Sequence, residues 1–256
     1  MTVIDLPTRI AREGADAELE TLLGAEPGRV ELLRAFIIAH PHIGRLVEER
    51  FAAHTSLVHL DQQIELHVPS LAGREIRVTA EAAPQRPHPT GTTVALQATL
   101  TDIADGTALA SLHGTVLLAG ITAEPVVAAA PRHQPAAASG EPRVRHVGVG
   151  QNFISAYARI SGDDNPIHLV PKAARAAGFE GTIAHGMSIV GLVLARAPRR
   201  ATAVGVRFAQ PVVVDDIVRL SIGRTVDPGE FRVAVASERG PVIKAGWLRV
   251  SQEAVR

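Results

Sequence analysis

Two hydrophobic periodicities divide the first half of the chain. Apolar side chains in residues 13–24 and 29–53 follow the spacing of a helix face, which predicts two α-helices. Pro41 predicts a break within the second helix, because proline cannot donate the backbone hydrogen bond that a helix interior requires. The apolar positions of that helix are Leu32, Leu33, Phe36, Ile37, Leu46 and Val47.

From Leu57 onward, hydrophobic residues occur at every second position. Ile64, Leu66 and Val68 alternate with Glu65 and His67, a pattern that is typical of a half-buried strand. The same alternation predicts strands at 74–82, 92–102 and 106–118, with a proline-rich turn at 84–89.

A stretch rich in alanine and proline, residues 123–143, shows neither the helical nor the strand spacing of apolar residues and is predicted to be a linker. An apolar helix is predicted beyond it at 183–197. Further strands are predicted at 203–208, 216–225, 230–238 and 242–250.

The two halves resemble each other in sequence. Pro69 and Arg77 lie the same distance apart as Pro211 and Arg219, and each pair flanks a loop that leads into a strand. Ile38-Ala39-His40 similarly resembles Ile183-Ala184-His185. We therefore predict an α+β protein with an N-terminal half at 1–122, the linker at 123–143 and a C-terminal half at 144–256. Each half would be a helix followed by antiparallel strands that wrap around it.

Composition limits the classes of function. Hydrophobic residues make up 46% of the chain and aromatic residues 3%, so the core must consist mainly of aliphatic side chains. The 26 basic and 26 acidic residues cancel, which argues against a nucleic-acid groove or a polybasic membrane site. No cysteine is present, which excludes disulfides and a thiolate nucleophile and fits a reducing cytosol. The apolar helix falls short of the roughly 20 residues of a membrane span, and no signal peptide is evident, so a cytoplasmic protein is expected.

Potential chemistry is concentrated between Asp163 and His168. A carboxylate can accept a proton from water, and an imidazole exchanges protons near neutral pH. Asn165-Pro166 predicts a turn that folds His168 back toward Asp163. By composition alone, the same segment is equally typical of ordinary turn and helix-capping structure.

The string Ser161-Gly-Asp-Asp-Asn-Pro-Ile-His168 resembles the signature of the MaoC-like (R)-specific enoyl-CoA hydratases, also called the hydratase 2 family. Tyr157, Gly178-Phe179 and the segment from Ile183 to Met187 match other parts of the family pattern in order. The resemblance implies a double hot-dog fold, in which each half wraps a sheet around a helix. It also implies hydration of trans-2-enoyl thioesters to (R)-3-hydroxyacyl thioesters, or the reverse dehydration.

The resemblance also implies roles for individual residues. Asp163 would activate water, while His168 would bind the same water and deliver a proton to C2. The Gly186 N–H would stabilise the oxyanion. The remaining predicted oxyanion or substrate-binding residues are Asn165, His185, Ile183 and Met187; His185 is equally predicted to cap local backbone. No metal or redox cofactor is expected, and CoA or an acyl carrier protein would carry the substrate.

Several alternatives remain open at this level. Pro41 stands where the second half has Gly186 and has no N–H to donate, so the N-terminal half is predicted to be catalytically degenerate. A hot-dog thioesterase would carry an acidic residue on the central helix, but residues 183–197 contain none. A non-catalytic acyl-thioester-binding subunit is the other alternative. The carrier, the acyl chain length and the choice between monomer and homodimer are not determined by the sequence.

Overall fold

The computed structural model describes residues 3–8, 15–53, 55–128 and 133–251. These residues form two compact units. Unit 1 contains residues 1–11 and 34–133, and unit 2 contains residues 12–33 and 134–256. Residues 12–33 thus belong with unit 2, although the sequence analysis assigned them to the N-terminal half.

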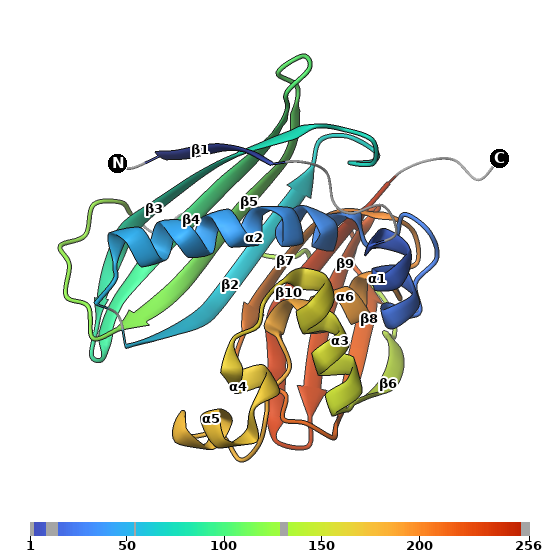
Figure 1. Cartoon of the computed structure of the whole chain (residues 1–256). Coiled ribbons are helices and arrows are strands. Elements are labelled where there is room, and N and C mark those ends of the chain that lie inside the picture. Colours follow the sequence, from blue (N-terminus) through green and yellow to red (C-terminus); the bar gives the residue numbers. More distant parts are fainter. Residues whose placement is uncertain (1–2, 9–14, 54, 129–132, 252–256) are drawn as a thin grey trace. The chain divides into compact units, whose positions relative to one another are not determined.

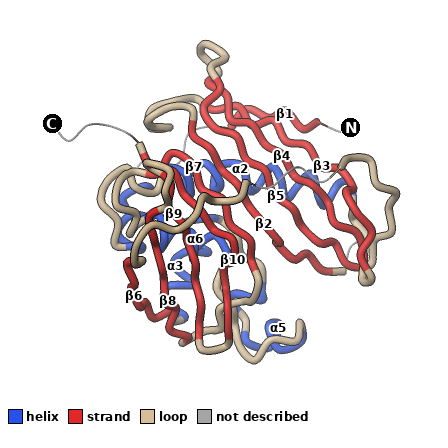
Figure 2. Tube along the Cα trace, turned by 180° about the vertical axis from the view of Figure 1, so that it is seen from behind, coloured by secondary structure: helices blue, strands red, loops and turns tan. Residues whose placement is uncertain are grey.

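Unit 1 is an antiparallel sheet with a long helix on one face. Its strands lie in the order β1-β3-β4-β5-β2. Helix α2 (Glu31–Arg50) crosses one face of this sheet, as both Figure 1 and the opposite view in Figure 2 show. The strands are β1 (Val3–Thr8), β2 (Ser56–Leu66), β3 (Ile76–His88), β4 (Gly91–Asp102) and β5 (Ala108–Ala119).

Unit 2 repeats this topology. Its strands lie in the order β6-β8-β9-β10-β7, so in both units the sequential strands are arranged as first, third, fourth, fifth and second. The strands are β6 (Arg143–Val149), β7 (Ala201–Phe208), β8 (Asp216–Arg224), β9 (Glu230–Ser237) and β10 (Gly240–Val250). The helices are α1 (Ala15–Leu23), α3 (Gln151–Ser161), α4 (Pro166–Leu169), α5 (Pro171–Ala176) and α6 (Gly186–Leu194). The shared strand order supports the internal duplication that the sequence indicates.

Aliphatic side chains fill both cores, as the low aromatic content requires. In β3, Ile76, Val78, Ala80 and Ala82 are buried at alternate positions. In unit 2, every residue of α6 from Met187 to Leu194 is buried. A Cβ at Gly191 would lie 2.7 Å from a methyl group of Leu33, so glycine permits this close packing.

The predicted turn at 84–89 is wrong, because β3 continues through it to His88. Strand β1 pairs with β3 only as far as Glu81, whereas β4 pairs with β3 along the whole length of β3. The prolines therefore lie where β3 has a strand partner on one side only, a position that tolerates the missing N–H. The backbone carbonyl of Pro84 accepts a hydrogen bond from the Val126 N–H (2.9 Å), in the segment that follows β5.

Three other expectations about the elements require correction. Helix α2 continues through Pro41 without a break, since its buried apolar stripe stabilises the helix on both sides. Strand β1 precedes α2 and strand β6 directly precedes α3, and neither strand was predicted. The apolar helix begins at Gly186 and not at Ile183, because Ile183 forms a β-bridge with Val213 that holds the chain extended.

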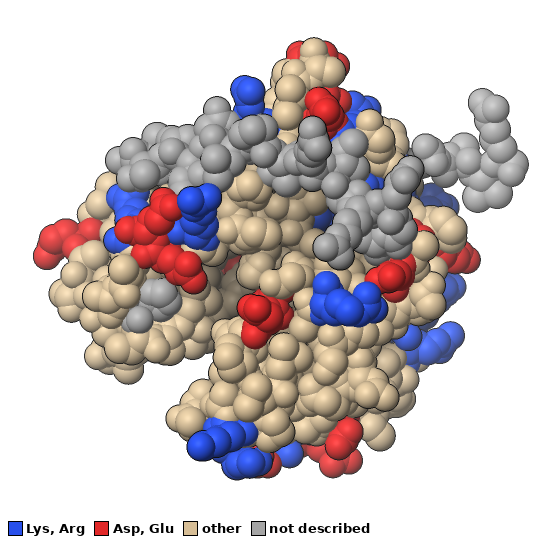
Figure 3. Space-filling view, in the orientation of Figure 1, with Lys and Arg blue, Asp and Glu red and all other residues tan. Residues whose placement is uncertain are grey.

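Charged side chains are mixed in sign on the face shown in Figure 3, in keeping with the zero net charge. In the part of the chain that the structure describes, no helix is both long enough and apolar enough to cross a bilayer.

A substitution in β7 tests the packing of unit 2. Gly205 lies opposite Trp247 in the pairing of β7 with β10, and a Cβ at this position would collide with the indole ring. Because Trp247 is 3% exposed and has little room to move, Gly205→Ala is expected to lower the free energy of unfolding by about 1–3 kcal/mol. Urea denaturation measures the change. Gly148→Ala in β6 is the matched control, because no atom lies within 4 Å of its added methyl group; equal stability of the two variants would contradict the packing argument.

Candidate active site

Asp163 lies directly after the end of α3. Gly162 adopts the left-handed conformation (φ 73°), and its N–H donates to the carbonyl of Ala158 at 2.8 Å. Glycine enters this conformation without steric cost, so it ends the helix at a defined residue. The side chain of Asp163 is 27% exposed and thus remains accessible to water or a substrate.

Asn165 organises the turn between Asp163 and His168. Its N–H donates to Asp163 Oδ1 (3.3 Å), and its own Oδ1 accepts from the Ile167 N–H (3.2 Å). Asn165 is therefore the N-cap of α4, with Pro166 as the first helical residue. The turn forms as predicted, and His168 lies within the short helix that follows it. The observed contacts of the Asn165 side chain are those of a cap.

The ring of His168 is held in one orientation. It is 8% exposed, and Nδ1 lies 2.7 Å from the carbonyl oxygen of Ile183. Because a carbonyl oxygen only accepts, Nδ1 must carry a hydrogen, which leaves Nε2 as the nitrogen that exchanges protons. This bond gives Ile183 a defined position beside the cluster, through its backbone and not its side chain.

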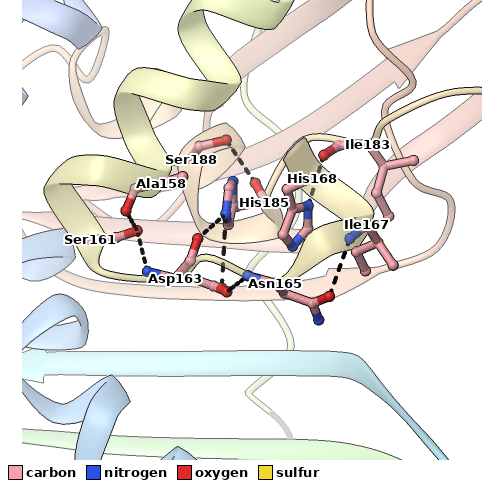
Figure 4. A network of polar contacts seen from close by, with 9 residues as sticks. All are labelled: Ala158, Ser161, Asp163, Asn165, Ile167, His168, Ile183, His185 and Ser188. Atoms are coloured by element: carbon pink, nitrogen blue, oxygen red, sulfur yellow. Dashed lines mark hydrogen bonds and ion pairs between the residues drawn. The ribbon is translucent and has the colours of Figure 1, made fainter. Parts of the chain in front are cut away.

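His185 connects the two ends of the site. Its Nε2 lies 3.0 Å from the backbone oxygen of Asp163 and 4.0 Å from Oδ2 of the same residue. Its ring stacks on that of His168, with the centroids 3.7 Å apart (Figure 4). His185 is the residue before α6, yet its side chain makes no capping bond to that helix. The side chain instead supports the loop of Asp163.

The three side chains also lie close enough together to be considered as metal ligands. One potential ligand atom each from Asp163, His168 and His185 lies within 4.8 Å of the others. Zinc holds such ligands at roughly 2.0–2.2 Å, so they must converge on one point. The two imidazole rings instead stack with planes that differ by 28°, and His168 Nδ1 and His185 Nε2 already lie within hydrogen-bond distance of backbone carbonyl oxygens. This geometry suits proton exchange better than metal ligation.

Gly186 begins α6 beside this cluster. The first N–H groups of a helix have no partner within it, and no hydrogen bond from the Gly186 N–H occurs among the described residues. The carbonyl of His185 accepts from the N–H (3.0 Å) and Oγ (2.7 Å) of Ser188, which fixes the first turn. A Cβ at Gly186 would lie 2.9 Å from Cε1 of Phe208. Met187 follows and is 3% exposed.

Two positioning residues were missed by the sequence analysis. Ser188 holds the carbonyl of His185, and its place three residues after the histidine was an available signal. The amide of Gln151 donates to the carbonyl of His168 at 3.1 Å. Because Gln151 lies 17 residues away at the other end of α3, no local pattern points to it.

Comparison with known proteins places this cluster in a family. Residues 133–230, which include all the predicted site residues, match the family described as MaoC like domain. This part of the chain is therefore similar to MaoC-like domains. Over 64 residues the chain is 47% identical to 3-hydroxyacyl-thioester dehydratase X of Mycobacterium tuberculosis. The aligned segment makes up 24% of this chain and 23% of that protein. The chain spans less than a quarter of the length of the curated relatives that it matches.

Solved structures extend the likeness of the fold beyond the MaoC-like domain. The structure of HtdX from Mycobacterium tuberculosis matches with a TM-score of 0.77 at 22% identity, over 96% of this chain and 98% of that chain. A second Mycobacterium tuberculosis protein, described as having a double hotdog fold, matches with a TM-score of 0.60 at 16% identity, over 97% and 94% of the two chains. The predicted α+β double hot-dog fold is confirmed.

Proposed function

We propose that this chain catalyses the hydration of trans-2-enoyl thioesters to (R)-3-hydroxyacyl thioesters and the reverse dehydration. The observation that carries the proposal is that the accessible carboxylate of Asp163 has an oxygen within 4.8 Å of a ring nitrogen of His168, whose Nδ1 is bound to a carbonyl. The similarity to 3-hydroxyacyl-thioester dehydratase X of Mycobacterium tuberculosis supports the same class of reaction.

Each group in the site then has a step to perform. In hydration, Asp163 takes a proton from water as the water oxygen bonds to C3, and the electron pair of the C2=C3 bond moves toward the thioester oxygen. His168 delivers a proton from Nε2 to C2, and the proton held by Asp163 replaces it. The N–H of Gly186, at the positive end of α6, stabilises the negative charge on the thioester oxygen.

This reaction requires no external redox partner. Addition of water to a polarised double bond is redox-neutral, and we propose that the protein residues transfer the protons without a metal. The thioester is carried by CoA or by an acyl carrier protein, and the chain acts as a monomer with an internal pseudo-dimer or as a homodimer. In this proposal, unit 2 holds the site, since unit 1 continues α2 through Pro41 and contains no Gly-Asp-x-Asn-Pro-x-His string.

Product analysis tests the proposed function. With crotonyl-CoA, the enoyl-thioester absorbance is expected to fall and chiral analysis to give (R)-3-hydroxybutyryl-CoA. Release of free CoA thiol would instead indicate a thioesterase, although α6 offers no carboxylate for that chemistry. A chain that converts neither short nor long enoyl thioesters, on CoA or on carrier protein, would contradict the proposal.

A further inference from the structure

Tyr157 contains a buried polar atom that packing does not explain. The residue is 1% exposed, and among the described residues its hydroxyl has no hydrogen-bond partner. A buried hydroxyl without a partner destabilises the folded state. Phenylalanine would fill nearly the same volume without this cost.

The ring of Tyr157 lies at the catalytic cluster. Its centroid is 5.0 Å from that of His185, which in turn stacks on His168 at 3.7 Å. Tyr157 thus packs as a third ring against the two stacked imidazoles, tilted by 51° from the ring of His185. His185 also contacts the backbone oxygen of Asp163, so all three rings belong to one packed group around that residue.

The hydroxyl remains protonated at any working pH. Burial raises the pKa of Tyr157 well above its usual range, and the negative charge of Asp163 raises it further. The hydroxyl is therefore a neutral hydrogen-bond donor. A buried donor at this place needs an acceptor, and the molecules that reach Asp163 are water and substrate.

We propose that the Tyr157 hydroxyl donates a hydrogen bond to the oxygen atom that adds to C3 during hydration and leaves C3 during dehydration. This inference rests on the proposed function and adds a third catalytic group to Asp163 and His168. The reacting oxygen gains hydroxide character as Asp163 takes its proton, and a fixed donor stabilises that developing charge. The hydroxyl keeps its own proton throughout.

Tyr157→Phe separates this role from packing. The variant is expected to lower kcat for hydration of crotonyl-CoA by ~10- to 100-fold, the range for one lost hydrogen bond to a developing charge, with KM changed less than about threefold. The temperature of unfolding is expected to stay equal or rise, because a buried hydroxyl without a protein partner has been removed. Wild-type activity in the variant would overturn the proposal, as would a fall in unfolding temperature that accompanies the loss of kcat.

A second measurement does not depend on turnover. Tyr157 is the only tyrosine in the chain, so tyrosine labelled with ¹³C at Cζ gives a single NMR resonance. (R)-3-Hydroxybutyryl-CoA is expected to shift this resonance, whereas butyryl-CoA, which lacks the 3-hydroxyl, leaves it nearly unchanged. Identical responses to the two ligands would overturn the inference. If the proposed function is wrong, the wild-type protein is instead expected to be inactive. The NMR comparison of the two ligands can still be made in that case.

Discussion

Asparagine in place of Asp163 is expected to lower kcat for hydration of an enoyl thioester by roughly 10²- to 10⁴-fold, the usual contribution of a general base. The substitution preserves the shape of the side chain and an oxygen that can accept from the Asn165 N–H. The turn from Asp163 to His168 should therefore form, while the carboxylate that is proposed to remove a proton from water is lost. Steady-state kinetics with crotonyl-CoA measure the effect.

Asp164→Asn is the matched control for this experiment. Asp164 is exposed, directly follows Asp163 and undergoes the same change of charge. We expect its kcat to stay within about twofold of the wild type, since surface substitutions away from a site have small effects. Equal losses in the two variants would show that net charge and not general base catalysis is responsible, and an active Asp163→Asn would contradict the assignment of Asp163.

Proline in place of Gly186 is expected to lower kcat by roughly 10²- to 10³-fold, the usual effect of removing one oxyanion donor. Proline removes the N–H yet suits the first position of a helix. The preceding residue, His185, already has the extended conformation that a following proline demands (φ −61°, ψ 130°). The measurement compares kcat and KM, because a donor used mainly in the transition state affects kcat more than KM.

The control must account for the bulk of the new side chain. Gly186→Ala retains the N–H but adds the same Cβ, which contacts the ring of Phe208. If the N–H stabilises the oxyanion, the alanine variant should retain much more activity than the proline variant. Similar losses in both variants would assign the effect to the collision with Phe208 and would contradict the role of the N–H.

The comparison of the two units explains why only one carries the motif. Both have the same strand order, and each places helical structure between its first and second strands. In unit 1 this helical region includes one helix, α2, which continues through Pro41. In unit 2 the chain is divided into α3, α4, α5 and α6, and the site residues lie between and at the ends of these helices. Interruption of the helical region therefore creates the loop and the free helix N-terminus that the proposed chemistry requires.

Features with local causes were determined by the sequence. Alternation in residues 92–102 predicts β4 because the side chains of a strand point to opposite faces in turn. The turn around Asn165 is equally local, since its side-chain hydrogen bonds join residues two positions apart. The motif and its family likewise follow from one short string, and residues 133–230 match that family.

Features that depend on distant partners were decided only by the tertiary structure. Pro84 belongs to a strand because β4 pairs with it there while β1 does not, which no local pattern reveals. His185 contacts a carbonyl 22 residues away, and His168 contacts one 15 residues away, so both ring orientations arise from packing of separate segments. The burial of the Tyr157 ring against that of His185 has the same origin. The sequence thus determined which chemical groups are present, whereas the fold determined which of their atoms meet, because those contacts join segments that only the folded chain brings together.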